Sequence, residues 1–154
     1  MTVDVIAVAA EMAAAVPFAR TLGIAVVDVT VDDTGLTAVA TLPDEERLHN
    51  HVGGPHAGAI FTLGETASGA VVLAGFGAHL DRCTPLAVRA DVTYLKLARG
   101  PLRATARLDR TASSILAELD AGARPEFPVT VAVTRADGAV TTQLTVVWTL
   151  RPNS

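Results

Sequence analysis

Cysteine, aromatic residues and charged residues are all scarce in this sequence. Its 154 residues include one cysteine, Cys83, so no disulfide can form within the chain, and this favours an intracellular, cytoplasmic protein. Aromatic residues make up 4% and charged residues 18% of the chain. The formal net charge is −4, and neither a basic excess nor a run of like charge occurs, which argues against a nucleic acid as partner.

Apolar residues, by contrast, are plentiful. They make up 50% of the chain, which is enough for a folded core and excludes intrinsic disorder. The longest weakly polar stretch, residues 57–75, carries Glu65 near its middle, and Asp4 and Glu11 replace the basic start of a signal peptide. We therefore expect no membrane partner and a buried apolar surplus, part of it between subunits.

Hydrophobic periodicity predicts a helix, two strands, a long helix and then four strands. The expected ranges are helices 2–16, 56–74 and 113–119 and strands 24–31, 36–42, 85–97, 102–110, 127–134 and 139–150. Pro17 is expected to end the first helix, and Asp137-Gly138 predicts a hairpin turn. The long helix is apolar nearly all round, so it must be surrounded on most sides. The order predicts an α+β fold, a curved antiparallel sheet around one central helix, in one domain spanning residues 1–154 with its core at 17–150.

A carboxyl group on the long helix is the first feature that points to chemistry. Glu65 is the only ionisable residue between Ala57 and Ala78, and no cationic residue lies one helical turn away. Burial raises the pKa of such a carboxyl, which improves it as a general base or as a nucleophile in a dry site. The alternative is a helix residue that faces a solvent-filled interface.

The start of the same helix is the second feature. Pro55-His56-Ala57-Gly58 is expected to present free backbone N–H groups and the positive end of the helix dipole, which together stabilise an oxyanion. Upstream, the Asn50 amide either donates to a carbonyl oxygen or only braces its loop, and His56 either caps the helix or contacts the substrate. Because Glu65 lies roughly 13 Å along the helix from His56, the two can share one carbonyl only if they come from different chains.

This stretch resembles the hotdog-fold acyl-CoA thioesterases, in particular their PaaI-like branch. The resemblance covers about residues 17–150 and is carried by Asn50, Gly53, His56-Ala57-Gly58, Glu65 nine residues after the histidine, and the flanking segments PFARTLGIAV, LPDEERLHN and YLKLARGPLRATARL. It implies a hotdog fold, a homodimer with a continuous sheet or a homotetramer, and an acyl-CoA substrate. No separate cofactor is implied, since coenzyme A arrives as part of the substrate.

The resemblance also implies a role for each matching position. Glu65 would be the base or the nucleophile, and the N–H of Ala57, where the family usually has glycine, would polarise the thioester carbonyl. Asn50 and His56 would orient the substrate or a water molecule. Substrate contacts are expected from Gly58, Ser68, Gly69, Cys83, Thr84, Lys96 and Arg99, with Thr66 and Arg103 as further candidates for water and phosphate.

The sequence thus predicts an acyl-CoA thioesterase, and the alternative is a hotdog module that binds an acyl group or acyl-CoA without turnover. A dehydratase or hydratase is disfavoured, because no suitably spaced Asp–His pair is found. A metal site is not expected, since His49, His51 and His56 lack an accompanying carboxylate or cysteine. The acyl group is not specified, although Phe61, Leu63, Val72 and Tyr94 are expected to line its pocket.

Overall fold

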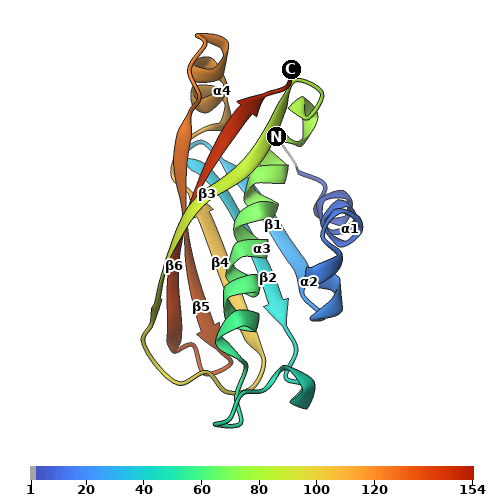
Figure 1. Cartoon of the computed structure of the whole chain (residues 1–154), viewed down its shortest axis with the longest axis vertical. Coiled ribbons are helices and arrows are strands. Elements are labelled where there is room, and N and C mark those ends of the chain that lie inside the picture. The colour runs from blue at the N-terminus through green and yellow to red at the C-terminus, as the bar shows by residue number, and fades with distance from the viewer. Residues whose placement is uncertain (1–2) are drawn as a thin grey trace.

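The fold is a six-stranded antiparallel sheet curved around a long helix, seen in a computed structural model that describes residues 3–154 (Figure 1). The strand order is β1-β2-β4-β5-β6-β3, and every neighbouring pair is antiparallel. The strands are β1 (Ala25–Asp32), β2 (Gly35–Leu42), β3 (Cys83–Tyr94), β4 (Leu102–Leu108), β5 (Glu126–Arg135) and β6 (Val140–Pro152). This arrangement confirms the predicted α+β architecture.

Four helices complete the fold: α1 (Val5–Ala15), α2 (Pro17–Thr21), α3 (Ala57–Phe76) and α4 (Ala112–Asp120), with short 3₁₀ turns at Glu46–Leu48 and Gly77–His79. The prediction that the first helix begins at residue 2 was wrong. Asp4 caps α1 by accepting hydrogen bonds from the N–H groups of Ile6 and Ala7, and residue 2 itself lies outside the described residues. Pro17 ends α1 as expected but also begins α2, where its missing N–H is not needed, and the periodicity did not predict that helix.

The core lies between α3 and the concave face of the sheet. Leu63, Ala67 and Val71 of α3 are completely buried there, and the tilted rings of Phe76 and Phe127 pack with their centroids 5.3 Å apart at its far end. By length and composition the segment Ala57–His79 could span a membrane, but 67% of its most apolar window is buried inside the protein. The apolar circumference of α3 is therefore explained by the sheet that surrounds it.

Strand β3 forms one edge of the sheet. One side of β3 pairs with β6, and the pairing is interrupted by a bulge between Ala87 and Arg89. Within residues 3–154, no strand pairs with its other side. The strand runs from 83 to 94 rather than 85 to 97, because the N–H groups of Leu95 and Lys96 both turn to the Thr141 carbonyl. Every other predicted element apart from the first helix agrees within two residues at each end. Most residues of β3 are exposed, and a long open edge of this kind favours pairing with another strand.

Candidate functional site

Glu65 lies in an apolar groove on the side of α3 that the sheet leaves open. The groove has a volume of about 190 Å³ and is lined by residues of α1, α3, β3 and β6, namely Met12, Ala15, Val16, Glu65, Gly69, Val72, Leu73, Pro85 and Trp148. Within the described chain the Glu65 carboxylate has no hydrogen-bond or ion-pair partner. As expected, burial raises its pKa above the ordinary value of 4.5. This carboxyl is therefore a better proton acceptor near neutral pH than an exposed glutamate.

Two neighbours of Glu65 on α3 keep this groove open. A Cβ atom at Gly69 would lie 3.5 Å from Met12 Cε and 3.9 Å from the Trp148 ring, so the glycine leaves the space between these side chains free. The Trp148 ring is held by Ser68, whose Oγ accepts from Trp148 Nε1 (3.1 Å) and donates to the Glu65 carbonyl (2.7 Å). Ser68 is completely buried, so the structure gives its hydroxyl a bracing position rather than one that could orient water.

The loop before α3 and the first residues of the helix form a second polar site. His56 is the N-cap, and its Nδ1 accepts from the Gly58 N–H at 2.8 Å. Asn50 braces the loop, since its Oδ1 accepts from the N–H groups of Val52 and Gly54. Ala57 is the first helical residue and is exposed, and its N–H has no acceptor in the described part of the chain. Of the predicted backbone donors at Ala57 and Gly58, the Ala57 N–H is the free one. The Asn50 amide nitrogen donates to the Pro55 carbonyl at 3.4 Å, which uses one of its two N–H groups.

One chain does not bring Glu65 and Ala57 together. Both lie on α3 and are eight residues apart, which corresponds to roughly 12 Å along the helix axis. Tyr94 at the end of β3 donates from its hydroxyl to the Ala57 carbonyl at 3.3 Å. The free edge of the sheet therefore ends beside the start of α3.

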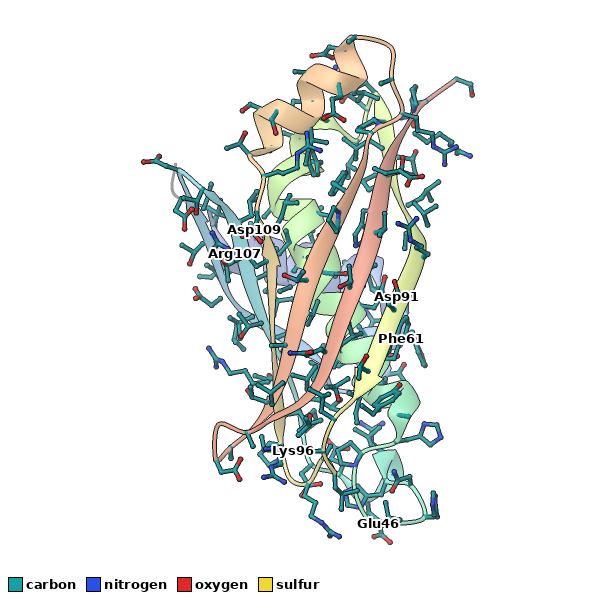
Figure 2. All side chains as sticks on the ribbon, turned by 90° about the vertical axis from the view of Figure 1, so that its left-hand side faces the viewer. Glu46, Phe61, Asp91, Lys96, Arg107 and Asp109 are labelled. Atoms are coloured by element: carbon teal, nitrogen blue, oxygen red, sulfur yellow. The ribbon has the colours of Figure 1, made fainter. Side chains whose placement is uncertain are left out.

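The predicted basic residue Lys96 lies at this same end of the molecule (Figure 2), and Arg99 follows it three residues later in the same segment. The Asn50 loop packs against their segment so closely that a Cβ at Gly54 would lie 2.3 Å from the Ala98 carbonyl oxygen. Arg135 of β5 joins them by donating to the Leu97 carbonyl at 3.2 Å and by lining a shallow surface pocket together with Arg99. Arg135 is not among the predicted residues, because its contact with this segment depends on tertiary packing.

The other predicted contacts are dispersed. Cys83 and Thr84 lie just beyond the opposite end of α3, where burial raises the pKa of the Cys83 thiol and the Thr84 hydroxyl donates to Asn153. Val72 lines the Glu65 groove, whereas Leu63 is completely buried in the core. Gly58 lies exposed at the helix start.

The three loop histidines are not gathered into one cluster. His49 Nε2 lies 2.7 Å from Asp44 Oδ1, and His56 is engaged at the helix cap. Across residues 3–154, no three His, Cys, Asp or Glu side chains stand close enough to hold a metal ion.

Comparisons with known proteins bear on the fold and the family. The sequence model of a family described as "Domain of unknown function (DUF4442)" matches residues 6–150, and no curated protein matches the chain. A Pseudomonas aeruginosa protein of unknown function, called a probable thioesterase, is 23% identical with a TM-score of 0.81, covering 99% of both chains. A mutant thioesterase from Pseudomonas aeruginosa is 18% identical with a TM-score of 0.74, covering 99% of this chain and 97% of the other.

A third solved structure, from Ralstonia eutropha JMP134, is named as a candidate thioesterase related to phenylacetic acid degradation. It is 20% identical with a TM-score of 0.67, and the match covers 87% of this chain and 89% of that one. At these identities the likenesses concern the fold, and they confirm the expected hotdog architecture.

Proposed function

The chain belongs to the family described as domain of unknown function DUF4442, and from that premise we propose that it is an acyl-CoA thioesterase acting as a homodimer. The observation that carries the proposal is the unpartnered Glu65 carboxyl in an apolar groove, on the same helix whose first N–H, that of Ala57, is free. A base and an oxyanion donor are the two groups that thioester hydrolysis needs. The names of the similar structures are consistent with this activity.

The chemistry assigns one task to each group. Glu65 takes a proton from water while the water oxygen forms a bond to the thioester carbon, and the Ala57 N–H donates to the carbonyl oxygen as it becomes negative. The carbon–sulfur bond then breaks, the proton passes from Glu65 to the departing thiolate, and the products are a free acid and coenzyme A. Direct attack by Glu65 through an anhydride that water then hydrolyses gives the same products.

A second copy of the chain supplies the missing half of each site. For Ala57 of one chain to reach Glu65 of the other, the two-fold axis must pass midway between them along α3, close to Phe61. Figure 2 shows the stretch of β3 around Asp91 at a height similar to that of Phe61. We infer that β3 pairs with β3 of the second copy along this part of its free edge.

The charges on β3 favour one register for that pairing. Antiparallel strands centred on Ala90 place Arg89 of each chain opposite Asp91 of the other, and opposite charges in directly facing positions stabilise a sheet. Both side chains are exposed in the single chain. Arg89 lies 3.8 Å from its own Glu126, and an exposed ion pair of that length competes only weakly.

Coenzyme A is expected to lie with its phosphates against Lys96 and Arg99. Arg135 lies beside them, but its guanidinium is already paired with Asp137 (Nε–Oδ1 3.2 Å, Nη2–Oδ2 2.8 Å). These side chains stand at the end of the molecule where α3 begins, so a thioester carbonyl at Ala57 and phosphates at the basic residues can belong to one extended ligand. Guanidinium groups bind phosphate oxygens through paired hydrogen bonds. The role of Arg103 in phosphate binding stays a prediction.

The proposal is tested by measuring thiol release from a panel of acyl-CoAs. Glu65→Gln is expected to lower kcat by roughly 10²–10⁴-fold, because it removes the base and keeps the size of the side chain. Glu11→Gln makes the same chemical change at an exposed position of α1 and serves as the matched control. Equal activity of Glu65→Gln and the wild-type protein would refute the assignment of Glu65. Tight acyl-CoA binding without thiol release by the wild-type protein would favour a binding module.

A further inference from the structure

The Glu65 groove continues along α3 away from the end where Ala57 lies. The residues of α3 that line it are Glu65, Gly69, Val72 and Leu73, which recur at the three- to four-residue spacing of one helix face. Leu73 lies eight residues beyond Glu65, which corresponds to roughly 12 Å along the helix axis. A ligand that reacts at Glu65 can therefore extend from there toward Leu73.

The groove offers such a ligand apolar walls. Apart from Glu65, the residues that line it bring no charge. Trp148 has one polar group, its indole N–H, and this already donates to Ser68 at 3.1 Å. A charged or hydroxylated acyl chain would lose its hydrogen bonds to water here and gain none from these walls, which is unfavourable. A hydrocarbon chain loses none, and its burial is favourable, so the groove selects an apolar acyl group.

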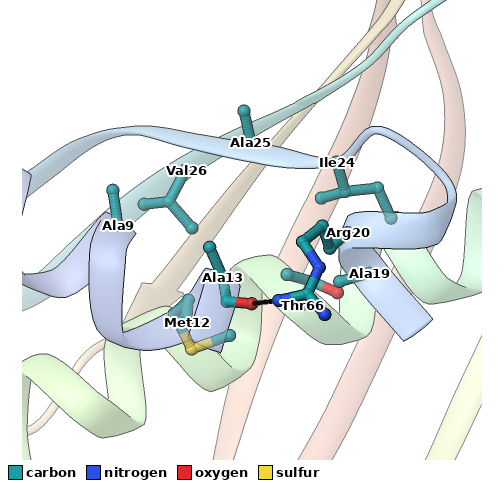
Figure 3. Close-up of a pocket in the computed structure, with 9 residues that line it drawn as sticks. All are labelled: Ala9, Met12, Ala13, Ala19, Arg20, Ile24, Ala25, Val26 and Thr66. Atoms are coloured by element: carbon teal, nitrogen blue, oxygen red, sulfur yellow. Dashed lines mark hydrogen bonds between the residues drawn. The ribbon is translucent and has the colours of Figure 1, made fainter. Parts of the chain in front are cut away.

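Helix α1 makes the outer wall of the groove. Three of its residues line the groove, and one of them, Met12, points from α1 toward α3 (Figure 3). The helix is anchored through the buried side chains of Val8 and Met12. The guanidinium of Arg20 in α2 also donates to the Ala13 carbonyl at 2.9 Å, as the dashed line in Figure 3 marks. These contacts give the wall a fixed position relative to α3.

A smaller cavity of about 120 Å³ lies beside Met12, between α1, α2, β1 and α3 (Figure 3). The Thr66 hydroxyl is buried there, without a hydrogen-bond partner among residues 3–154. Its oxygen has almost no accessible surface, so the prediction that Thr66 orients a water molecule was wrong. The open groove, and not this cavity, is therefore the space that a ligand at Glu65 can enter.

Gly69 sets the width of the groove between Met12 and Trp148. A Cβ atom at Gly69 would lie 3.5 Å from Met12 Cε and 3.9 Å from the Trp148 ring, and both are ordinary contact distances between carbon atoms. The space beside Gly69 is therefore about as wide as one methyl group. An unbranched chain of methylene groups can pass through it, whereas a chain with a branch at this point cannot.

The volume of the groove limits the length of the chain. At about 190 Å³ the groove is a little larger than a cavity of about 150 Å³ that admits benzene, a ring of six carbon atoms. It therefore holds roughly six to eight carbon atoms. The distance of roughly 12 Å between Glu65 and Leu73 along the helix is long enough for such a chain in its extended form.

We propose that the Glu65 groove takes an unbranched aliphatic acyl chain of roughly six to eight carbon atoms, with α1 as its outer wall and Gly69 as the residue that decides which chains pass. The inference rests on the proposed thioesterase function for the position of the thioester carbonyl at Glu65. The substrate class is therefore the coenzyme A thioester of a medium-chain fatty acid.

The test measures kcat/KM for butanoyl-CoA, octanoyl-CoA and dodecanoyl-CoA. The wild-type protein is expected to prefer octanoyl-CoA to both of the others. Gly69→Ala is expected to lower the ratio of kcat/KM for octanoyl-CoA to that for butanoyl-CoA roughly tenfold, because about two methylene groups beyond this position are no longer buried. The shorter chain ends before Gly69 and is affected less.

Gly75→Ala is the matched control on the same helix. A Cβ atom there would also meet its neighbours at ordinary contact distances, 3.5 Å from Leu36 Cδ2 and 3.6 Å from Ala112 Cβ, but Gly75 does not line the groove. This variant should leave the ratio unchanged. Both variants should unfold at an equal or higher temperature than the wild-type protein, because alanine is the better helix former, so loss of the fold would not explain the result.

Binding of octanoyl-CoA and butanoyl-CoA to a Glu65→Gln background separates this inference from the proposed function. Tighter binding of octanoyl-CoA that Gly69→Ala weakens supports the acyl-chain site even if no thioester is hydrolysed. Hydrolysis without a preference for octanoyl-CoA, with a preference that Gly69→Ala leaves intact, or with a higher kcat/KM for benzoyl-CoA overturns the site and leaves the thioesterase proposal standing. If no thioester is either bound or hydrolysed, both proposals fail.

Discussion

The start of α3 and its middle, eight residues further on, differ in what surrounds their polar groups. At the start, His56 and Asn50 are bonded to nearby backbone groups, and the N–H donor of Ala57 is left exposed. In the middle, Glu65 has no partner, and its groove is lined by side chains such as Met12. One region offers a donor at the positive end of a helix and the other an acceptor with a raised pKa. Because both groups lie on one rigid helix, they can act on the same carbonyl only if they come from two different chains.

After the loss of the Glu65 carboxyl, the largest expected effect comes from removing the donor at the start of α3. Ala57→Pro deletes the free N–H at the first helical position, where proline is tolerated, and His56 already has the extended backbone that a following proline requires (φ −62°, ψ 143°). We expect kcat to fall roughly 10²–10³-fold, as for the loss of an oxyanion donor, while the protein stays folded. Steady-state kinetics and circular dichroism measure the two effects.

Ala57→Gly is the control for that substitution, because it changes the side chain and keeps the N–H. It should retain most of the wild-type activity. If Ala57→Pro is folded and fully active, the start of α3 contributes no donor to the reaction, and the role assigned to the Ala57 N–H is wrong.

A smaller effect is expected from the charges on β3 that would bring the two regions together. Arg89→Asp places like charges opposite each other at two symmetric positions and should weaken the dimer by roughly tenfold to a hundredfold, and the reverse change Asp91→Arg should do the same. The double exchange restores opposite charges and should restore the dimer. Sedimentation measures association, and Arg151→Asp at the exposed end of β6 is the control.

If the double exchange stays as monomeric as the single variants, the register centred on Ala90 is wrong. If all the variants stay dimeric, β3 is not the edge that pairs.

The fold was largely predictable because its signals are local. The apolar circumference of α3 predicted that a sheet surrounds it, and the alternation of Leu102–Leu108 predicted β4 at its observed start. The helix α2 was missed because Pro17 acts both as the end of one helix and as the start of the next, and only the packing of Ala19 into the core selects the second role. The single-domain boundaries and the cytoplasmic location stay predictions.

The candidate site was only partly predictable, because a side chain's bonding partners depend on tertiary contacts. Glu65 could be identified from its isolation in the sequence. The bracing role of Ser68 could not, since its partner Trp148 is 80 residues away. Likewise, Thr66 is one of several helix hydroxyls in the sequence, and its lack of a partner follows from the way α1 and α2 cover it.

The smallest expected effect is a pH-dependent change in stability that depends on Glu65, in the middle of α3. Because the folded-state pKa of Glu65 is raised, the folded protein holds this proton more tightly than the unfolded chain does. As the pH rises from about 4.5 through the raised pKa, ionisation of Glu65 therefore lowers the free energy of unfolding. Below that range the carboxyl is protonated in both states and has no such effect. Glu65→Gln should gain stability relative to the wild-type protein as the pH rises through this window.

Urea unfolding at pH 4 and pH 7 measures that difference. A difference between Glu65→Gln and the wild-type protein that stays constant between the two pH values would mean that Glu65 is solvated like an ordinary surface carboxyl.

Mixing two inactive variants tests the shared site most directly. Glu65→Gln chains and Ala57→Pro chains are unfolded together in equal amounts and refolded, so that about half of the dimers contain one chain of each kind. If each site takes Glu65 from one chain and Ala57 from the other, one of the two sites in every mixed dimer is intact, and the account predicts about a quarter of wild-type activity. Activity no higher than that of the two variants measured separately, in a sample shown to contain mixed dimers, would contradict it.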